Sequence, residues 1–445
     1  MSYPKIPDYN SLVSRLCLYS QLKHEYGTKC VAPILAKAEE ALIIALNELQ
    51  HLPIDSELVK QEPNDLHSIQ SLRPIGPRRL WNEFDKGLYQ DKMEGALMGR
   101  MAGCTLGAPV EFWPISRMEA LAQESGIPFP PVDYWSYIPD PYKKRYGLSP
   151  REDYTRDKMD GVPVDDDLAY TMLGLLVAED YGLDFTTGDV GKAWLKYLPY
   201  ACSAEDIALK NLKAGIPAAE SGEKNNPYCE WIGADIRADT WGYLAPAWPE
   251  QAAEMAYRDA FISHRRQGIY GEMFFAAVIA AAFSVSHPVE ALEIGLTEIP
   301  EHCALAQAVR WTLEVAPKIH DYHQAREAVE GRFKGMNPVH TINNACLTIW
   351  GLTLGGTDFT RVIGETVAMG MDNDCTAATA GSIVGAIVGK KGIPEHWVRN
   401  FNNTVHSYLI GHRRFAISDL IRRFTKVAVR VYGEVPNPAL KLQST

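Results

Sequence analysis

The chain has 445 residues, 46% hydrophobic and 22% charged, so it can bury a large core and is not expected to be disordered. Because its formal net charge is -11, the chain lacks the excess positive charge that binds nucleic acid or an anionic membrane, and we expect neither as a partner. The eight cysteines form no C-x-x-C pair and no signal peptide is evident, which favours reduced thiols and a cytoplasmic location.

The first 85 residues differ in pattern from the remainder. Residues 11–50 carry apolar side chains at helical spacing, whereas residues 52–84 are polar and interrupted by prolines. We therefore predict an N-terminal helical extension and connector over residues 1–85, and a separate domain over residues 86–445. Long Ala- and Gly-rich helical patterns without a βαβ series predict that the domain is all-α.

Two later segments stand out from this helical pattern. Residues 126–163 combine many prolines with Tyr134, Trp135, Tyr137, Tyr142 and Tyr146. A loop of this kind either walls a pocket or wraps the surface of the core, and the sequence leaves both open. Residues 274–283 form the longest apolar run, which is shorter than the ~20 residues of a membrane span and predicts a buried core helix.

Three consecutive aspartates, Asp165, Asp166 and Asp167, stand at the predicted start of an apolar helix. Helix capping explains one or two of them, because a carboxylate at this position accepts hydrogen bonds from free backbone N–H groups. Three adjacent carboxylates repel one another unless a cation lies among them. Capping and metal binding are both open at this point.

A second acidic pair, Asp372 and Asp374, also begins an apolar helix. The helix that follows is lined by small residues, which allow close approach of another helix. Buried carboxylates are costly without a counter-charge, and Mg²⁺ or Mn²⁺ prefers such oxygen ligands. Together the two clusters predict a two-metal site, in which the ions lie ~3.5–4 Å apart.

Three blocks in this order resemble the ADP-ribosylglycohydrolase family, typified by the enzyme that removes ADP-ribose from dinitrogenase reductase. They are a Gly-rich stretch ending in Glu111 (residues 94–111), the aspartate block at 164–167, and the D-x-D block at 371–378 with a closing segment at 393–397. The resemblance covers roughly residues 90–400 and leaves the first 85 outside it.

The resemblance implies a compact orthogonal helical bundle, all-α, with two Mg²⁺ or Mn²⁺ ions in a catalytic domain over residues 86–445. The metal positions it implies are Asp165, Asp166, Asp167, Asp372, Asp374 and Cys375, and the catalytic residues are Glu111, Asp166 and Asp374. Val164 stands where the family has a Thr ligand, and Asp167 is expected to supply the missing oxygen. Cys375 replaces the Thr after the D-x-D, and Cys104 stands where an Asp is frequent, so the metal ligands differ from the common set.

The resemblance also marks a substrate-binding region in the middle of the chain. Its residues are Asp235, Arg237, Asp239, His264, Tyr270 and Gly271. The alternative for the segment 235–239 is a helix start stabilised by salt bridges.

The function expected from these features is metal-dependent hydrolysis of a glycosidic, most simply N-glycosidic, bond to a ribose-like sugar. ADP-ribose on a protein or on a small molecule is the leading substrate, and a nucleoside or other small glycoside is the alternative. A non-catalytic, crystallin-like or ligand-binding relative is the alternative of another class. The oligomeric state is left open.

Overall fold

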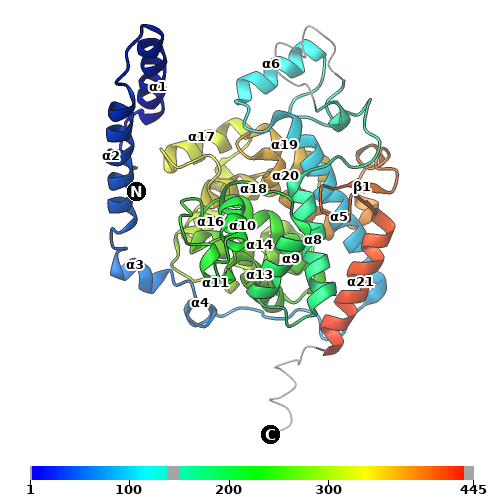
Figure 1. Ribbon diagram of the computed structural model, residues 1–445. Helices are drawn as coiled ribbons and strands as arrows, with labels where there is room; N and C mark the ends of the chain where they lie inside the picture. The colour runs from blue at the N-terminus through cyan, green and yellow to red at the C-terminus, as the bar shows by residue number, and fades with distance from the viewer. Residues whose placement is uncertain (1–2, 138–150, 435–445) are drawn as a thin grey trace. The chain divides into compact units, whose positions relative to one another are not determined.

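The computed structural model describes residues 3–137 and 151–434, and the chain divides into two units, residues 1–60 and 61–445 (Figure 1). Residues 138–150, which include Tyr142 and Tyr146 of the proline-rich segment, lie outside the described residues. Helices dominate both units, which confirms the all-α class.

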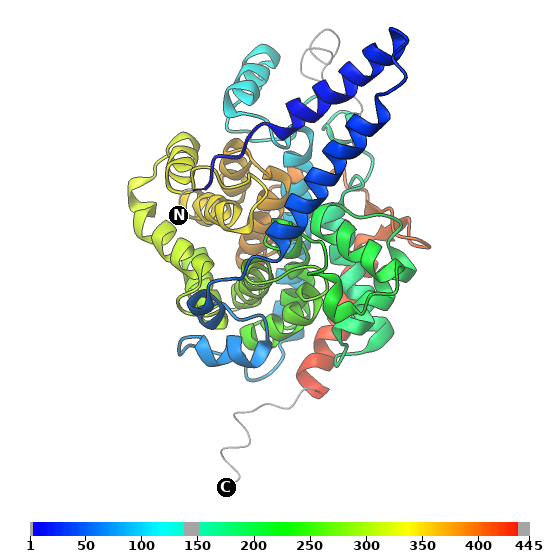
Figure 2. The ribbon, with the colours of Figure 1, turned by 60° about the vertical axis from the view of Figure 1, so that its left-hand side comes forward.

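The first unit contains α1 (Tyr9–Glu25), α2 (Ala32–Gln50) and most of α3 (Ser56–Gln61). The chain turns back on itself between α1 and α2, as Figure 2 shows. Residues 3–60 include no buried side chain, and α2 leaves apolar residues such as Ile43 and Leu49 exposed. The described part of this unit therefore has no core of its own.

The second unit begins at Gln61, ahead of the boundary predicted at residue 86. The difference arises because the connector packs on the main unit: Ile69 is fully buried, and Arg73 forms an ion pair with Glu298 at 2.6 Å. Glu298 is 225 residues away from Arg73 along the chain.

The helices of the second unit surround α14 (Gln267–Ala282), every residue of which is buried. This confirms the predicted core helix. The other helices are α4 (Leu66–Leu72), α5 (Lys86–Gly107), α6 (Ile115–Ser125), α8 (Asp166–Tyr181), α9 (Thr187–Tyr197), α10 (Ser203–Lys213), α11 (Ala218–Ser221), α12 (Ala238–Leu244), α13 (Pro249–Ala260), α15 (Pro288–Gly295), α16 (Ala304–Val315), α17 (Tyr322–Arg332), α18 (Thr341–Gly355), α19 (Phe359–Ala368), α20 (Asn373–Val388) and α21 (Ile417–Glu434).

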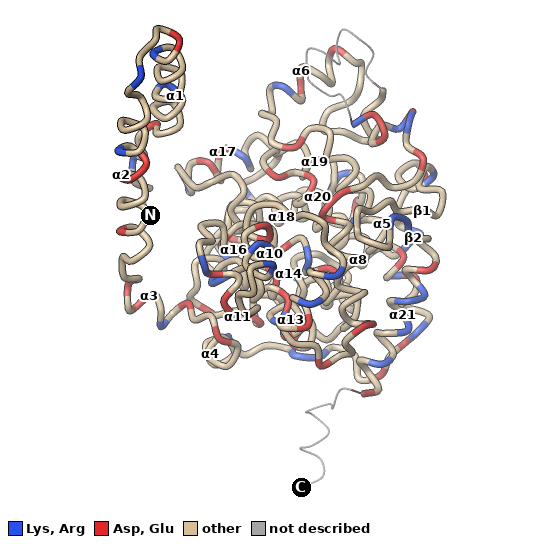
Figure 3. Tube along the Cα trace, viewed as in Figure 1, with Lys and Arg blue, Asp and Glu red and all other residues tan. Residues whose placement is uncertain are grey.

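Short 3₁₀ helices and one small sheet complete the unit. The 3₁₀ helices are η1 (Ala108–Val110), η2 (Glu152–Tyr154), η3 (Ile232–Arg237), η4 (Leu296–Glu298), η5 (Ala316–Lys318), η6 (Lys390–Gly392) and η7 (Glu395–Trp397). Strands β1 (Thr404–His406) and β2 (Arg414–Ala416) pair antiparallel, with Val405 opposite Phe415. In the part of the chain that the structure describes, every helix is too short or too polar to cross a membrane. Acidic and basic residues are scattered over the elements in Figure 3.

The closest helix pair is α5 against α20, which run antiparallel through the centre of the unit. Glycines recur on α5 at every fourth position, which places them on one face of the helix. Each one lies against a backbone carbonyl of α20, and an added Cβ would overlap it; the pairs are Gly95 with Gly385, Gly99 with Gly381, Gly103 with Ala377, and Gly107 with Asn373. The two backbones are therefore in direct contact along four helical turns.

The described part of the proline-rich segment packs on this core. Tyr134 and Trp135 are buried; the Tyr134 hydroxyl donates to the carbonyl of Trp397 at 2.7 Å, and Trp135 Nε1 donates to the carbonyl of Leu106 at 3.1 Å. These contacts match the surface-wrap alternative for residues 126–137.

Replacing Gly103 with Ala tests the backbone contact. The new methyl would meet the carbonyl of Ala377, so we expect the free energy of unfolding to fall by about 1–3 kcal/mol or more. Gly87→Ala in the same helix is the control, because its nearest neighbour would lie 3.5 Å away. Chemical denaturation measures both variants. Equal stability of the two would contradict the tight packing.

Candidate active site and metal centre

The α5–α20 contact brings two acidic segments together at one end of the helix pair. The chain leaves α5 through η1 and reaches Glu111, while Asp372 is the residue before α20. The Phe112 N–H donates to the carbonyl of Met371 at 2.9 Å. Both residues adopt left-handed backbone (φ 59° and 62°), which is uncommon for large side chains. Strained backbone of this kind clusters at functional sites.

The aspartate triplet lies at the start of α8. Asp165 is the N-cap and its Oδ1 accepts from the Asp167 N–H at 3.2 Å. Asp167 is buried, and Asp166 is half-buried. Capping therefore accounts for Asp165 and leaves the other two carboxylates without a capping role.

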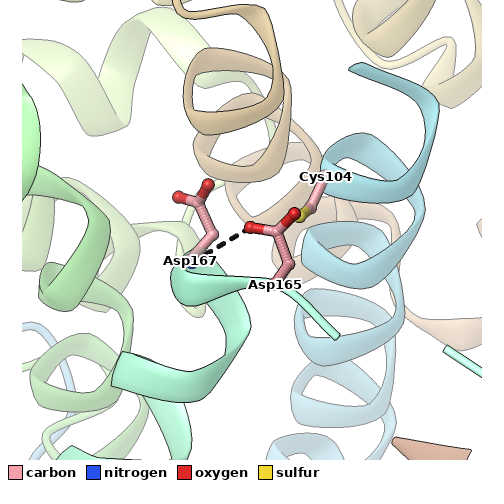
Figure 4. A group of neighbouring side chains, drawn as sticks. All are labelled: Cys104, Asp165 and Asp167. Carbon is pink, nitrogen blue, oxygen red and sulfur yellow. Dashed lines mark hydrogen bonds between the residues drawn. The ribbon is translucent and has the colours of Figure 1, made fainter. Parts of the chain in front are cut away.

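The two aspartate clusters form one continuous acidic site. Three groups of side chains each place their ligand atoms within 4.8 Å of one another: Cys104, Asp165 and Asp167; Asp167, Asp374 and Cys375; and Glu111, Asp372 and Asp374. Figure 4 shows the first group, with Asp165 directed toward Cys104 on α5. Because Asp167 and Asp374 each belong to two groups, the cluster runs unbroken from Cys104 to Glu111.

Two arginines lie against this cluster. Arg100 is fully buried; its Nη2 lies 3.6 Å from Asp167 Oδ1, and its Nη1 pairs with Asp239 at 2.6 Å. Arg151 Nη2 lies 3.4 Å from Glu111 Oε2. The two guanidinium groups supply two positive charges, one of which is shared with Asp239, whereas the cluster contains six carboxylates. Ionised carboxylates would therefore leave an excess of negative charge in the site.

This excess and the burial of the site hold protons on the carboxylates. Burial, followed by the charge of Asp166, raises the pKa of Asp165 to about 8. Burial and the charge of Asp372 raise the pKa of Glu111 to about 7. Burial also raises the pKa of Asp167 and of Asp374 well above the usual range. Without a further cation, the cluster cannot be fully ionised at neutral pH.

The site fits divalent ions on the chemistry of its donors. Asp167, Asp372 and Asp374 each present a buried Oδ1 that has no hydrogen-bond partner. An unpaired buried carboxylate oxygen is costly, and a bound cation removes that cost. Carboxylate oxygens are the ligands that Mg²⁺ and Mn²⁺ prefer.

The model of the ADP-ribosylglycohydrolase family matches residues 85–432 of this chain. The chain belongs to this family. The match extends beyond the region of resemblance seen in the sequence at both ends, and it makes the protein a glycohydrolase of this superfamily.

A solved structure described as an ADP-ribosylglycohydrolase-related protein complex is similar to the chain, with a TM-score of 0.52 and 20% identity. The similarity covers 78% of this chain and 99% of that one, and at this identity it shows the shared fold alone. A search of curated proteins gives no match.

Two residues predicted to bind substrate are instead engaged in buried ion pairs. Arg237 contacts three carboxylates, and the pairs are with Asp259 at 2.7 Å, Glu205 at 3.0 Å and Glu272 at 3.3 Å. Asp239 is fully buried against Arg100, which also donates to the carbonyl oxygens of Asp167 and Ile236. Both residues thus make the internal salt bridges that were the alternative to substrate binding.

The other predicted substrate-binding residues are also buried. Both carboxylate oxygens of Asp235 and the Nε2 of His264 have no hydrogen-bond partner, so a ligand-binding role for these two stays a prediction. Tyr270 donates to the carbonyl of Pro63 at 2.5 Å, which ties it to the connector. Gly271 faces Asp235, and a Cβ there would overlap the Asp235 carboxylate.

An aromatic pair that the sequence analysis did not single out lies within electrostatic reach of Asp166. The rings of Tyr200 and Tyr408 stack at 4.7 Å with an interplanar angle of 27°. Burial, followed by the charge of Asp166, raises the pKa of both tyrosines. The Ile410 N–H donates to the carbonyl of Tyr197 at 2.9 Å and so joins the two loops that carry them. These loops follow α9 and β1, and no sequence spacing connects them.

The raised carboxyl pKa values predict how the stability of the metal-free protein depends on pH. Because the folded state holds protons on Glu111 and Asp165 that the unfolded chain releases, stability should fall as pH rises from about 5 to about 8. Saturating Mn²⁺ should reduce this fall, since the ion offsets the repulsion. Thermal unfolding of chelator-treated protein across this range measures both effects. A melting temperature that rises with pH, or that responds identically with Mn²⁺, would contradict the prediction.

Proposed function

We propose that this protein is a metal-dependent glycohydrolase that cleaves an N-glycosidic bond to a ribose-like sugar, such as ADP-ribose on a protein or a small molecule. The observation that carries the proposal is the buried carboxylate cluster with unpartnered oxygens, in a chain of the ADP-ribosylglycohydrolase family. Two divalent ions, Mg²⁺ or Mn²⁺, are the proposed cofactors. The residues that would hold them are Asp165, Asp167, Asp372 and Asp374, with Cys375 alongside. Asp166, half-buried in the first turn of α8, is proposed as a ligand on the family resemblance alone.

The ions, when bound, would supply positive charge that orients the sugar hydroxyls and acidifies nearby water. The chain's own groups then provide the proton transfer. Glu111 is half-buried at the outer end of the cluster, and its pKa of about 7 suits both accepting a proton from water and returning one. Arg151 restrains the Glu111 carboxylate from one side.

The negative field of the site suits the developing charge of the reaction. Cleavage of a glycosidic bond builds positive charge at the anomeric carbon, which nearby carboxylates stabilise. Asp166 is half-buried, its charge reaches the tyrosine pair, and it is the carboxylate we assign to this role. Asp374, buried between Asp167 and Glu111, holds the two ends of the cluster together.

The stacked tyrosines are proposed to receive the flat part of the substrate. The exposed ring of Tyr200 offers a π-face to a nucleobase or an aromatic leaving group, and we place that group on the side of the cluster where Asp166 lies, since the charge of Asp166 reaches both rings. A nucleoside is the second candidate substrate, because Arg100 and Arg151 already pair with carboxylates and are not free to bind phosphate.

Turnover by an Asp374→Asn variant tests the metal-dependent site. Changing even an outer partner of a metal ligand costs roughly 10- to 100-fold, so we expect kcat to fall at least about 100-fold. The assay uses purified protein with Mg²⁺ or Mn²⁺ on ADP-ribosylated peptides and on nucleosides. Asp419→Asn on α21, whose carboxylate pairs with Arg422, is the control and should keep full activity. Absence of turnover by the wild-type protein on every ribosyl substrate would instead favour a non-catalytic, ligand-binding relative.

Substitution of Tyr200 tests the aromatic pair. Loss of one stacking ring costs ~1–3 kcal/mol, so Tyr200→Ala should raise KM about 5- to 150-fold for a substrate that carries a base. Tyr200→Phe keeps the ring and should keep KM near the wild-type value. If Phe is as damaging as Ala, or if Ala has no effect, stacking is not the role of this residue.

A further inference from the structure

The acidic cluster has two ends of different chemistry. At one end, Cys104 in the last turn of α5 groups with Asp165 and Asp167, and Cys375 in the first turn of α20 groups with Asp167 and Asp374. At the other end, Glu111 groups with Asp372 and Asp374, and all of these ligand atoms are oxygens. The helix contact that positions the carboxylates therefore positions two thiols among them, of which Figure 4 shows Cys104.

The thiol of Cys375 is directed at a carboxylate of the cluster. Its Sγ–H donates to Asp167 Oδ2 at 3.3 Å, while Asp167 Oδ1 has no hydrogen-bond partner. Asp374 Oδ1, from the same group, is buried and also without a partner. These unpartnered oxygens lie in the groups that contain the thiols, so the site offers sulfur and unused oxygen ligands together.

Cys104 adds a second sulfur to this end of the cluster. It is fully buried, and its ligand atom lies within 4.8 Å of those of Asp165 and Asp167. In a tetrahedral zinc site with sulfur and oxygen ligands, neighbouring ligand atoms are on the order of 3.5 Å apart. The 4.8 Å limit on the separation of these ligand atoms includes that spacing.

Sulfur and oxygen ligands select different ions. Thiolates favour Zn²⁺ and similar soft ions, whereas carboxylates without sulfur suit Mg²⁺ and Mn²⁺. We propose that one of the two ions is a thiophilic divalent ion such as Zn²⁺ in place of Mg²⁺ or Mn²⁺, held at the thiol end of the cluster by Asp167, Asp374 and Cys375, with Cys104 and Asp165 in the adjoining group that shares Asp167. The Glu111–Asp372–Asp374 end then takes Mg²⁺ or Mn²⁺, and the two ions are not interchangeable.

Binding at the thiol end balances in protons and charge. The ion takes the place of each thiol proton, the Sγ–metal bond forms as the S–H bond breaks, and the proton leaves to solvent. No oxidant or reductant is involved. This inference rests on the proposed function in one respect, namely that the cluster holds divalent ions.

Cobalt absorption spectroscopy on the full-length, chelator-treated protein tests the proposal directly. Co²⁺ substitutes for Zn²⁺, and a thiolate ligand gives it an intense near-ultraviolet charge-transfer band that oxygen ligands do not give. We expect the band to saturate at one Co²⁺ per chain, to disappear on addition of Zn²⁺, and to persist in excess Mg²⁺. Binding of Co²⁺ without the band, or displacement by Mg²⁺, would overturn the proposal.

Cysteine variants assign the band to the two thiols. Cys375→Ser and Cys104→Ser should each weaken it, and Cys375→Thr should shift preference toward Mg²⁺. Cys346→Ser is the matched control, because Cys346 is as buried as Cys104 but lies on α18 outside the three groups. Circular dichroism verifies that each variant is folded. If a variant fails to fold, the Co²⁺ band of the wild-type protein still tests whether a thiolate binds the ion. An undiminished band in both Cys104→Ser and Cys375→Ser would also overturn the assignment.

The experiment separates this inference from the proposed function. A thiolate band in a protein without glycohydrolase activity supports the ion site and contradicts the function. Turnover with Mg²⁺ in a protein that shows no thiolate band supports the function and contradicts the ion site.

Discussion

The direct contact between the backbones of α5 and α20 is the constraint on which the site depends. Four glycines on α5 meet Asn373, Ala377, Gly381 and Gly385 on α20, so no side chain separates the two helices. The contact ends where Gly107 touches the first residues of α20, and there the segments that carry Glu111 and Asp372 meet. A larger residue at any of these glycines would change the spacing of the carboxylates as well as the packing.

The acidic cluster shows a conflict between stability and function. Buried carboxylates that repel one another raise their own pKa values and destabilise the metal-free fold. The buried guanidinium of Arg100 on α5 offsets part of this repulsion. Its hydrogen bonds to Thr171 of α8 and Asp239 of α12 also join the three helices. The remaining excess charge is the physical basis for the proposal that the site binds cations.

The sequence predicted the all-α fold, the two acidic helix starts and the family, because each depends on local patterns. It could not separate capping from metal binding, since that depends on which distant segments meet. In the structure Asp165 caps α8 and also groups with Cys104, while Asp167 lies near both Cys104 and Asp374. Arg237 and its partner carboxylates are 22 to 35 residues apart, and nothing local marks them as partners. The same holds for the stacked Tyr200 and Tyr408.

The backbone contact between α5 and α20 also bears on how such an enzyme can change during evolution. An acidic cluster fixed to two helices that touch through glycine cannot shift by small steps, since an added Cβ at any of these glycines would overlap the facing backbone. We therefore expect changes in substrate to arise in the irregular loops after α9 and β1, where the Tyr200 ring is exposed and can be replaced without altering the helix contact. The helix pair then fixes the position of the acidic residues, and the loops set which group is received beside them.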